Sequence, residues 1–135
     1  MSEQSLFPML AYSDAAAAIE FLCKAFGFHE KMRHTDDAGR IGHAELECEG
    51  SVVMLADDHS EFGFTSPRDA TTCYSQLLLV VSDIDSHYER AKAAGAVVVG
   101  VPAEDHGSIG YRAMDCEGHR WLFSQRSQDS SEESS

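Results

Sequence analysis

Residues 41–50 read IGHAELECEG, and residues 109–118 read IGYRAMDCEG. Both stretches begin with Ile-Gly and end with Cys-Glu-Gly at the same spacing, so that Cys48 and Cys116 stand 68 positions apart. Two further matching segments open with Ser-Asp, and their aspartates are 69 positions apart. An offset held over most of the chain indicates an internal duplication, and two copies are too few for a solenoid. We therefore expect one domain made of two similar halves.

Composition and charge limit what the chain can be. It has 135 residues, of which 43% are hydrophobic and 24% charged, a balance typical of one globular domain. The formal net charge is −13, so the phosphates of nucleic acids and anionic membranes would repel the protein, and we expect neither as a partner. The last residues, 127–135, are acidic and of low complexity, which predicts a disordered tail after a single domain over 1–126.

The cysteines and the apolar segments bear on location. The four cysteines form no C-x-x-C pair; they are Cys23, Cys48, Cys73 and Cys116. No segment resembles a signal peptide, and none approaches the roughly 20 apolar residues that a membrane-spanning helix needs. We expect a cytoplasmic protein with reduced thiols and no zinc knuckle.

Each half predicts the same order of elements, βαβββ. In the first half (about 6–56), Asp14 and Gly27 bound an Ala-rich helix over 14–26. In the second half (about 73–126), Asp83 opens the matching helix over 83–94. Apolar or alternating segments predict the strands; these are 6–12, 28–35, 40–48 and 52–56, then 74–81, 96–102, 108–114 and 119–125. The predicted class is α+β, with residues 57–72 as the linker.

The repeated Cys-Glu-Gly falls between the last two strands of each half. It therefore marks a hairpin turn in each, where Gly50 and Gly118 supply the positive φ that such turns need.

Two tandem βαβββ modules resemble the vicinal oxygen chelate superfamily, the glyoxalase/bleomycin resistance protein/dioxygenase proteins. The stretch SDAAAAIEFLCKAFGF is similar to the family's first helix, and GSIGYRAMDCEGHRWLF to its closing hairpin, with Cys116 where the family usually has Pro. The likeness covers about residues 6–125. It implies a curved, cup-shaped mixed sheet with the helices on its convex side, and a homodimer. Whether paired modules complete the cup within one chain or across the dimer stays open.

The same resemblance implies positions for a divalent metal, held in the family by His, Gln or Glu on the first and last strands of each half. Local alignment carries these positions to Phe7 and Met54 in the first half, and to Gln76 and Leu122 in the second. Only Gln76 has a donor atom, so we expect no metal and no cofactor.

A second group of possible metal ligands alternates along one strand. His43, Glu45 and Glu47 share a face of the segment 40–48. Alternation from the aligned positions places this face opposite that of Met54, outside the cup. We therefore assign no catalytic and no metal-binding residue.

Starting from the four positions that the resemblance implies, alternation selects further side chains that line the cup, and Arg112 joins them if the closing hairpin pairs as in the family. The candidate ligand-binding residues are Phe7, Met9, Met54, Tyr74, Gln76, Leu78, Arg112, Arg120 and Leu122. The set is mostly apolar with a few polar points, as is common in small-molecule pockets. The two arginines need either an acidic partner in this chain or an anionic group of a ligand. Trp121 falls on the opposite face, in the core beneath the helices.

These residues favour a metal-free small-molecule-binding protein, which the resemblance extends to sequestration of a drug or metabolite. The alternative is a lyase, isomerase or dioxygenase of the same superfamily acting on a small oxygen-bearing substrate. That alternative needs metal ligands or a base in the cup, and alternation places none there. The acidic surface favours cationic ligands and the arginines favour anionic ones, so the sequence leaves the charge of the ligand open.

Overall fold

The structure, a computed structural model, describes residues 4–70, 72, 75–105 and 107–126. The tail predicted over 127–135, like Cys73 and Tyr74, lies outside the described residues. The first module consists of β1 (Met9–Tyr12), α1 (Ala15–Phe26), β2 (His29–Thr35), β3 (Ile41–Cys48) and β4 (Ser51–Asp57). After the short helix η1 (Ser60–Phe62), the second consists of β5 (Leu77–Val80), α2 (Ile84–Ala93), β6 (Val97–Asp105), β7 (Ser108–Met114) and β8 (Arg120–Arg126). The predicted α+β class and the two βαβββ modules are confirmed.

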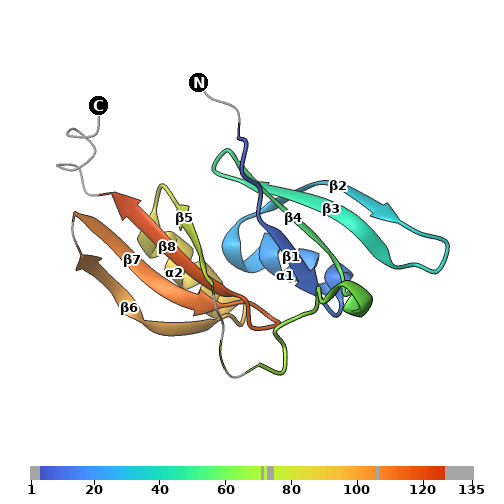
Figure 1. The fold of residues 1–135 in the computed structure, drawn as a ribbon. Helices are drawn as coiled ribbons and strands as arrows, with labels where there is room; N and C mark the ends of the chain where they lie inside the picture. The colour runs from blue at the N-terminus through green and yellow to red at the C-terminus, as the bar shows by residue number, and fades with distance from the viewer. Residues whose placement is uncertain (1–3, 71, 73–74, 106, 127–135) are drawn as a thin grey trace.

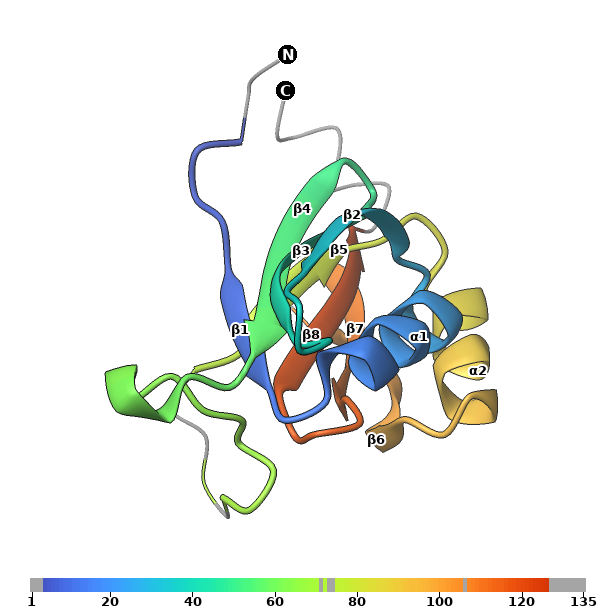
Figure 2. The same ribbon diagram turned by 90° about the vertical axis from the view of Figure 1, so that its right-hand side faces the viewer.

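Each module forms its own four-stranded mixed sheet. The strand orders, β1-β4-β3-β2 and β5-β8-β7-β6, are the same in the two modules. In each, the first strand pairs in parallel with the last, and the remaining pairs are antiparallel. Figure 1 shows the two sheets beside each other, and Figure 2 shows α1 and α2 together on one side of them. We call the sheet face that points away from the helices its outer face.

The helix boundaries follow from the capping residues. The carboxylate of Asp14 accepts a hydrogen bond from the N–H of Ala17, and Gly27 ends α1 in the left-handed conformation with φ 83°. In α2 the carboxylate of Asp83 accepts from the N–H of Ser86 in the same way. Both helices therefore begin where the Ser-Asp pairs predicted.

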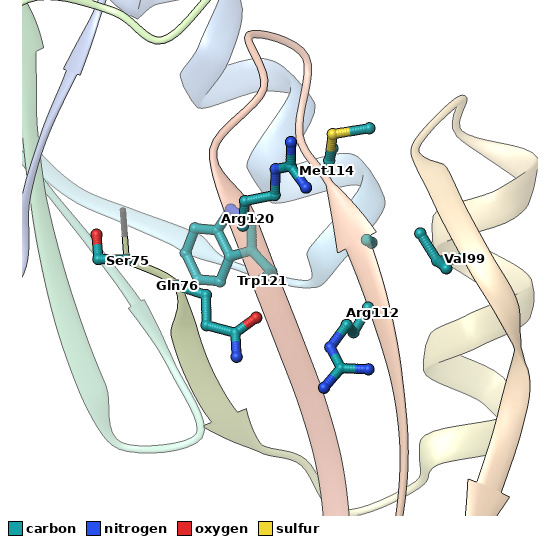
Figure 3. Close-up of a pocket in the computed structure, with 8 residues that line it drawn as sticks. Ser75, Gln76, Val99, Arg112, Met114, Arg120 and Trp121 are labelled. Atoms are coloured by element: carbon teal, nitrogen blue, oxygen red, sulfur yellow. The ribbon is translucent and has the colours of Figure 1, made fainter. Parts of the chain in front are cut away.

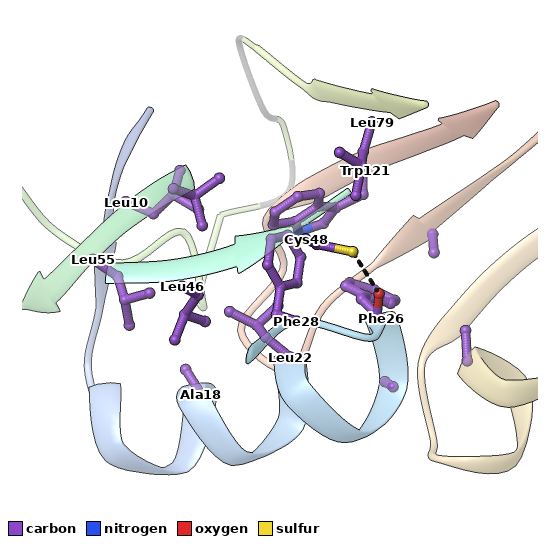
Figure 4. Close-up of a cluster of buried hydrophobic side chains, with 14 of the residues drawn as sticks. Leu10, Ala18, Leu22, Phe26, Phe28, Leu46, Cys48, Leu55, Leu79 and Trp121 are labelled. Carbon is purple, nitrogen blue, oxygen red and sulfur yellow. Dashed lines mark hydrogen bonds between the residues drawn. The ribbon is translucent and has the colours of Figure 1, made fainter. Parts of the chain in front are cut away.

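The core joins the two modules around the end of α1. The ring of Phe26 lies 4.7 Å from that of Phe123, and the ring of Phe28 lies 5.6 Å from that of Trp121, centroid to centroid. Figure 4 shows Leu22 and Phe26 of α1 in this cluster beside the first sheet and Trp121 of the second. Trp121 is only 1% exposed, which confirms its predicted place in the core. Each such side chain contributes about 1.5–3 kcal/mol by its burial.

Polar groups of α2 hold the C-terminal end of α1. The guanidinium of Arg90 donates to the carbonyls of Lys24 (2.8 Å) and Cys23 (3.1 Å), which have no partner within α1. The imidazole of His87 bridges the hydroxyl of Tyr111 (2.6 Å) and the carbonyl of Phe26 (3.0 Å). Burial lowers the pKa of His87, despite its hydrogen bond to Phe26, so the ring acts here as a neutral connector.

The two Cys-Glu-Gly turns make reciprocal contacts with the opposite module. The carboxylate of Glu117 accepts from the backbone N–H groups of Ser13 (2.6 Å) and Asp14 (2.9 Å), at the start of α1. It also accepts from the Ser66 hydroxyl and pairs with Arg68 (3.2 Å). We call this set of five residues the Glu117 latch.

Within the described residues, neither helix is long and apolar enough to cross a membrane.

Candidate ligand-binding site

The register of the second sheet decides which side chains reach its outer face. Leu122 on β8 lies between Leu78 on β5 and Arg112 on β7, and Arg120 pairs with Met114. Directly paired residues point to the same face of a sheet. Their neighbours along β8, Trp121 and Phe123, are buried on the helix side. The outer face therefore carries a row of apolar side chains with two arginines among them.

Two adjoining hollows lie on this outer face. The larger has a volume of about 380 Å³ and is lined by Ser75, Gln76, Val99, Arg112, Ala113, Met114, Arg120 and Trp121. The smaller has a volume of about 290 Å³; Leu78 and Leu122 line it, and it shares Val99 and Arg112 with the first. Of the nine residues predicted to bind ligand, five line one hollow or both; they are Gln76, Leu78, Arg112, Arg120 and Leu122.

Polar groups stand at both ends of the larger hollow. Figure 3 shows the amide of Gln76 and the guanidinium of Arg112 on either side of β8, with Arg120 at the other end beside Met114. Across the part of the chain that is described, neither arginine side chain has an ion pair or a hydrogen bond. The Nε of Arg120 is buried without a hydrogen-bond partner. The sequence suggested that each arginine pairs either with an acidic residue of this chain or with an anionic group of a ligand. Among the described residues, no acidic residue pairs with either one.

The first-module candidates lie elsewhere. Met9 pairs with Met54 in the first sheet, and Met9 is 62% exposed at its edge. Phe7 precedes β1 and is 37% exposed. None of these three lines either hollow, so the single chain does not bring Phe7 and Met54 together with Gln76 and Leu122. Tyr74, the remaining candidate, is not among the described residues.

One prediction about faces is wrong. Glu45 pairs directly with Met54, and Glu47 with Val52, so these carboxylates share the face of Met54 instead of opposing it. The cause is a shift of one residue between the two hairpins. The β3–β4 hairpin closes with Cys48 paired to Ser51, whereas β7–β8 pairs Met114 with Arg120 and leaves five residues in the turn. Such a shift moves every equivalent side chain to the other face.

The positions aligned with the family's metal ligands do not form a metal centre. The four aligned positions offer one amide and three apolar side chains, a donor set unsuited to a divalent cation. Nε2 of His43 lies 3.0 Å from a carboxylate oxygen of Glu45 on the first sheet. No third His, Cys, Asp or Glu joins them, and no cluster of three exists anywhere in the described ranges. The residues present do not fit the metal that the resemblance implied.

Comparisons with known proteins agree with this fold. Residues 6–123 match the family model described as Glyoxalase/Bleomycin resistance protein/Dioxygenase superfamily. The chain is 34% identical over 127 residues to an uncharacterised protein of Mycobacterium tuberculosis, covering 91% of this chain and 75% of the relative.

Solved structures agree as well. The crystal structure of TioX from Micromonospora sp. ML1 is similar with a TM-score of 0.73 and 32% identity, over 90% of this chain and 95% of that one. The fosfomycin resistance protein FosX of Listeria monocytogenes, solved with Mn(II) and sulfate, shares the fold with a TM-score of 0.70 at 14% identity, over 96% of this chain and 97% of that one. The chain belongs to the glyoxalase/bleomycin resistance protein/dioxygenase superfamily.

Proposed function

We propose that this protein is a metal-free binding protein that holds an amphipathic small molecule on the outer face of its second sheet, as a protein that sequesters a drug or metabolite would. The observation that carries the proposal is the pair of adjoining hollows of about 380 and 290 Å³. Their size and their mixture of apolar walls with a few polar groups are typical of sites for small organic molecules. The cytoplasmic location expected from the sequence stays a prediction.

Binding is favoured over catalysis by the chemistry of the lining. Neither hollow is lined by a described His, Asp or Glu, the usual general acids and bases. Tyr111 contributes to the smaller hollow, but its hydroxyl is hydrogen-bonded to His87. Burial raises the pKa of Tyr111 well above its ordinary value, which makes it a poor base at neutral pH.

A neutral fluorescent probe tests the proposal. Nile red should bind with an increase in emission, and Val99→Trp should weaken its binding about tenfold, because Val99 lines both hollows. Val97→Trp is the matched control: Val97 lies two residues away on β6, is 53% exposed and lines neither hollow. Absence of Nile red binding, or equal binding by the two variants, would refute the proposal.

Metal analysis separates this function from the metalloenzyme alternative. Protein dialysed against zinc, nickel, manganese or ferrous iron should retain no stoichiometric metal, because the aligned positions lack hard donors. One metal per chain, coordinated by side chains of the two outer faces, would restore the lyase, isomerase or dioxygenase.

We also propose that a second copy of the chain covers the outer faces. Large apolar side chains are exposed there in the single chain; they include Met9 on the first sheet and Leu78, Val80, Val99 and Val101 on the second. Exposed apolar patches of this kind mark interfaces.

The dimer has its own test. Sedimentation at micromolar concentration should give about twice the 14.8 kDa of one chain. Val80→Glu should shift the protein to monomer, since Val80 is 43% exposed on the outer face of β5. Ala93→Glu, at an exposed position of α2, adds the same charge and should leave the mass unchanged. A monomer of the unaltered chain would contradict the pairing.

A further inference from the structure

We infer that the larger hollow selects ligands that carry an anionic end group, a carboxylate above all, over neutral and cationic ligands of the same shape. This inference rests on the proposed function and adds the charge of the ligand to it. It concerns the positive end groups of Arg112 and Arg120 and the amide of Gln76, which share the hollow with the apolar side chains of Val99 and Met114.

Arg112 and Arg120 have no acidic partner among the described residues, although acids are abundant in this chain. The sequence holds 23 acidic residues against 10 lysines and arginines, so acidic partners are abundant. Yet among the described residues no carboxylate lines either hollow, and none pairs with Arg112 or Arg120. Arg112 is exposed to water, whereas the Nε of Arg120 is buried without a partner. A buried cationic group costs free energy unless a counter-charge or water satisfies it. The surroundings of these two side chains therefore leave room for a counter-charge from a ligand.

The first sheet shows that the positive charge is particular to the hollow. Arg112 is the direct cross-strand partner of Leu122, and Glu45 is the direct partner of Met54 at the matching place of the first sheet. Glu45 has a neighbour of its own, His43, at 3.0 Å. The two outer faces thus carry opposite charge at corresponding places, and only the positive one has the larger hollow.

The donors match a carboxylate in kind. A guanidinium presents N–H groups in a planar fork that binds the two oxygens of a carboxylate, and such charge-assisted hydrogen bonds are about twice as strong as neutral ones. The Gln76 amide adds an N–H donor at the same end as Arg112 (Figure 3). Val99 and Met114 supply apolar contact for the remainder of the molecule. The ligand class is an organic anion with an apolar body.

A series of three matched compounds tests this inference by displacement of Nile red and, directly, by calorimetry. The compounds are naphthalene-2-carboxylate, naphthalene-2-carboxamide and naphthalen-2-ylmethylammonium, which differ chiefly in charge. The carboxylate should bind at least about tenfold more tightly than the amide, as expected for one charge-assisted hydrogen bond in place of a neutral one. The ammonium compound should bind most weakly.

Variants then assign the preference to its residues. Arg120→Gln and Arg112→Gln should each reduce the ratio of carboxylate to amide affinity several-fold. Arg120→Lys, which keeps the charge but loses the planar fork, should fall between. Arg33→Gln is the control, because Arg33 forms its ion pair with Glu30 on β2 and its loss changes the net charge equally.

The outcomes separate the two claims. Equal affinity for carboxylate and amide, with Nile red still bound, overturns the anion preference and leaves the binding function standing. Absence of binding by Nile red and by all three compounds overturns both. The rival arrangement, in which carboxylates of a second copy neutralise the arginines, predicts that Arg120→Gln weakens the dimer in sedimentation while the carboxylate and the amide bind equally.

Discussion

The turns at Glu49 and Glu117 share the sequence Cys-Glu-Gly but differ in structure. In the first, Glu49 and Gly50 alone connect the strands, both with positive φ (53° and 81°), as in a type I′ hairpin. In the second, five residues form the loop, closed by the N–H of Asp115 bonded to the carbonyl of His119. Glu49 is exposed, and its carboxylate accepts only long hydrogen bonds from the N–H (3.4 Å) and the hydroxyl (3.3 Å) of Ser82. Glu117 is only 3% exposed, and its carboxylate accepts the hydrogen bonds of the Glu117 latch.

The difference teaches that a duplicated sequence can be retained while the pairing register of its strands changes. Because the second turn is longer, the shared positions of β3 and β7 point to opposite faces. Glu45 lies on the outer face, while Ala113, 68 positions later, is buried beside Trp121. The same shift puts Arg112 on the outer face and its counterpart Ala44 in the core. The charge of each outer face is thus set by the length of a turn.

The largest effect should separate the two glutamates. Glu117→Ala removes the acceptor of two backbone N–H groups at the start of α1, and we expect it to lower the free energy of unfolding by about 3 kcal/mol. Glu49→Ala should change it by no more than about 0.5 kcal/mol. Urea unfolding of the two variants measures both values. Equal losses would mean that the two turns are energetically equivalent despite their geometry.

The next effect should separate the two glycines of the repeated Ile-Gly. A Cβ added at Gly110 would lie 2.7 Å from the carbonyl oxygen of Phe123, a contact that forces the backbone to move. Gly110→Ala should therefore cost about 2 kcal/mol in urea unfolding. A Cβ at Gly42 meets nothing within 4 Å, so Gly42→Ala should be nearly neutral. A neutral Gly110→Ala would argue against the close approach of β7 and β8.

Acid should weaken the Glu117 latch. Burial acts to raise the pKa of Glu117, but hydrogen bonds from Ser66, Ser13 and Asp14 outweigh it and hold the pKa below its ordinary value of 4.5. A lowered carboxyl pKa stabilises the fold fully above the unfolded value, and the gain is lost as pH falls through the folded value. Below about pH 4.5, stability should therefore fall more steeply in the natural protein than in Glu117→Gln, as measured by urea unfolding across pH. Parallel curves would exclude the latch as an acid-sensitive element.

The smallest effect should favour the first turn. Glu49 is the one non-glycine among the described residues with positive φ, a conformation that asparagine adopts more readily. Glu49→Asn gives the Asn-Gly pair typical of type I′ turns and should raise stability by about 0.5 kcal/mol in thermal unfolding. Glu117→Asn should do the opposite, because the shorter side chain leaves the latch. A loss at both positions would remove this distinction between the turns.

Much of this fold could be predicted because its signals are local. Asp14 and Gly27 mark a helix whether or not anything packs on it, and the repeat gave the second helix. Strand ends were less accurate: β1 was expected from residue 6 but begins at Met9. Pro8 lacks an N–H, although its carbonyl still accepts from Met54. Ends depend on the partner strand, which the local sequence does not name.

The residues of the candidate site also divide into those that could be predicted and those that could not. The family alignment supplied Gln76, alternation from Leu122 gave Arg120, and the family's hairpin pairing gave Arg112; all three line the larger hollow. Alternation within a strand is a local property, but the relation between strands came from the resemblance. The face of Glu45 could not be predicted, since it depends on how many residues the other hairpin leaves unpaired. Nor does the sequence say which arginines lack an acidic partner.

The reciprocal turns have a consequence for how the chain unfolds. The first N–H groups of α1 find an acceptor on Glu117, which lies more than one hundred positions further along the chain, and the end of α1 is held by Arg90. Unfolding of the second half therefore removes hydrogen-bond partners from both ends of α1 in the first half. Amide hydrogen exchange in α1 should follow the global transition and not a local one. We therefore expect the two repeats to unfold as one cooperative unit, and neither half to persist when it is expressed alone.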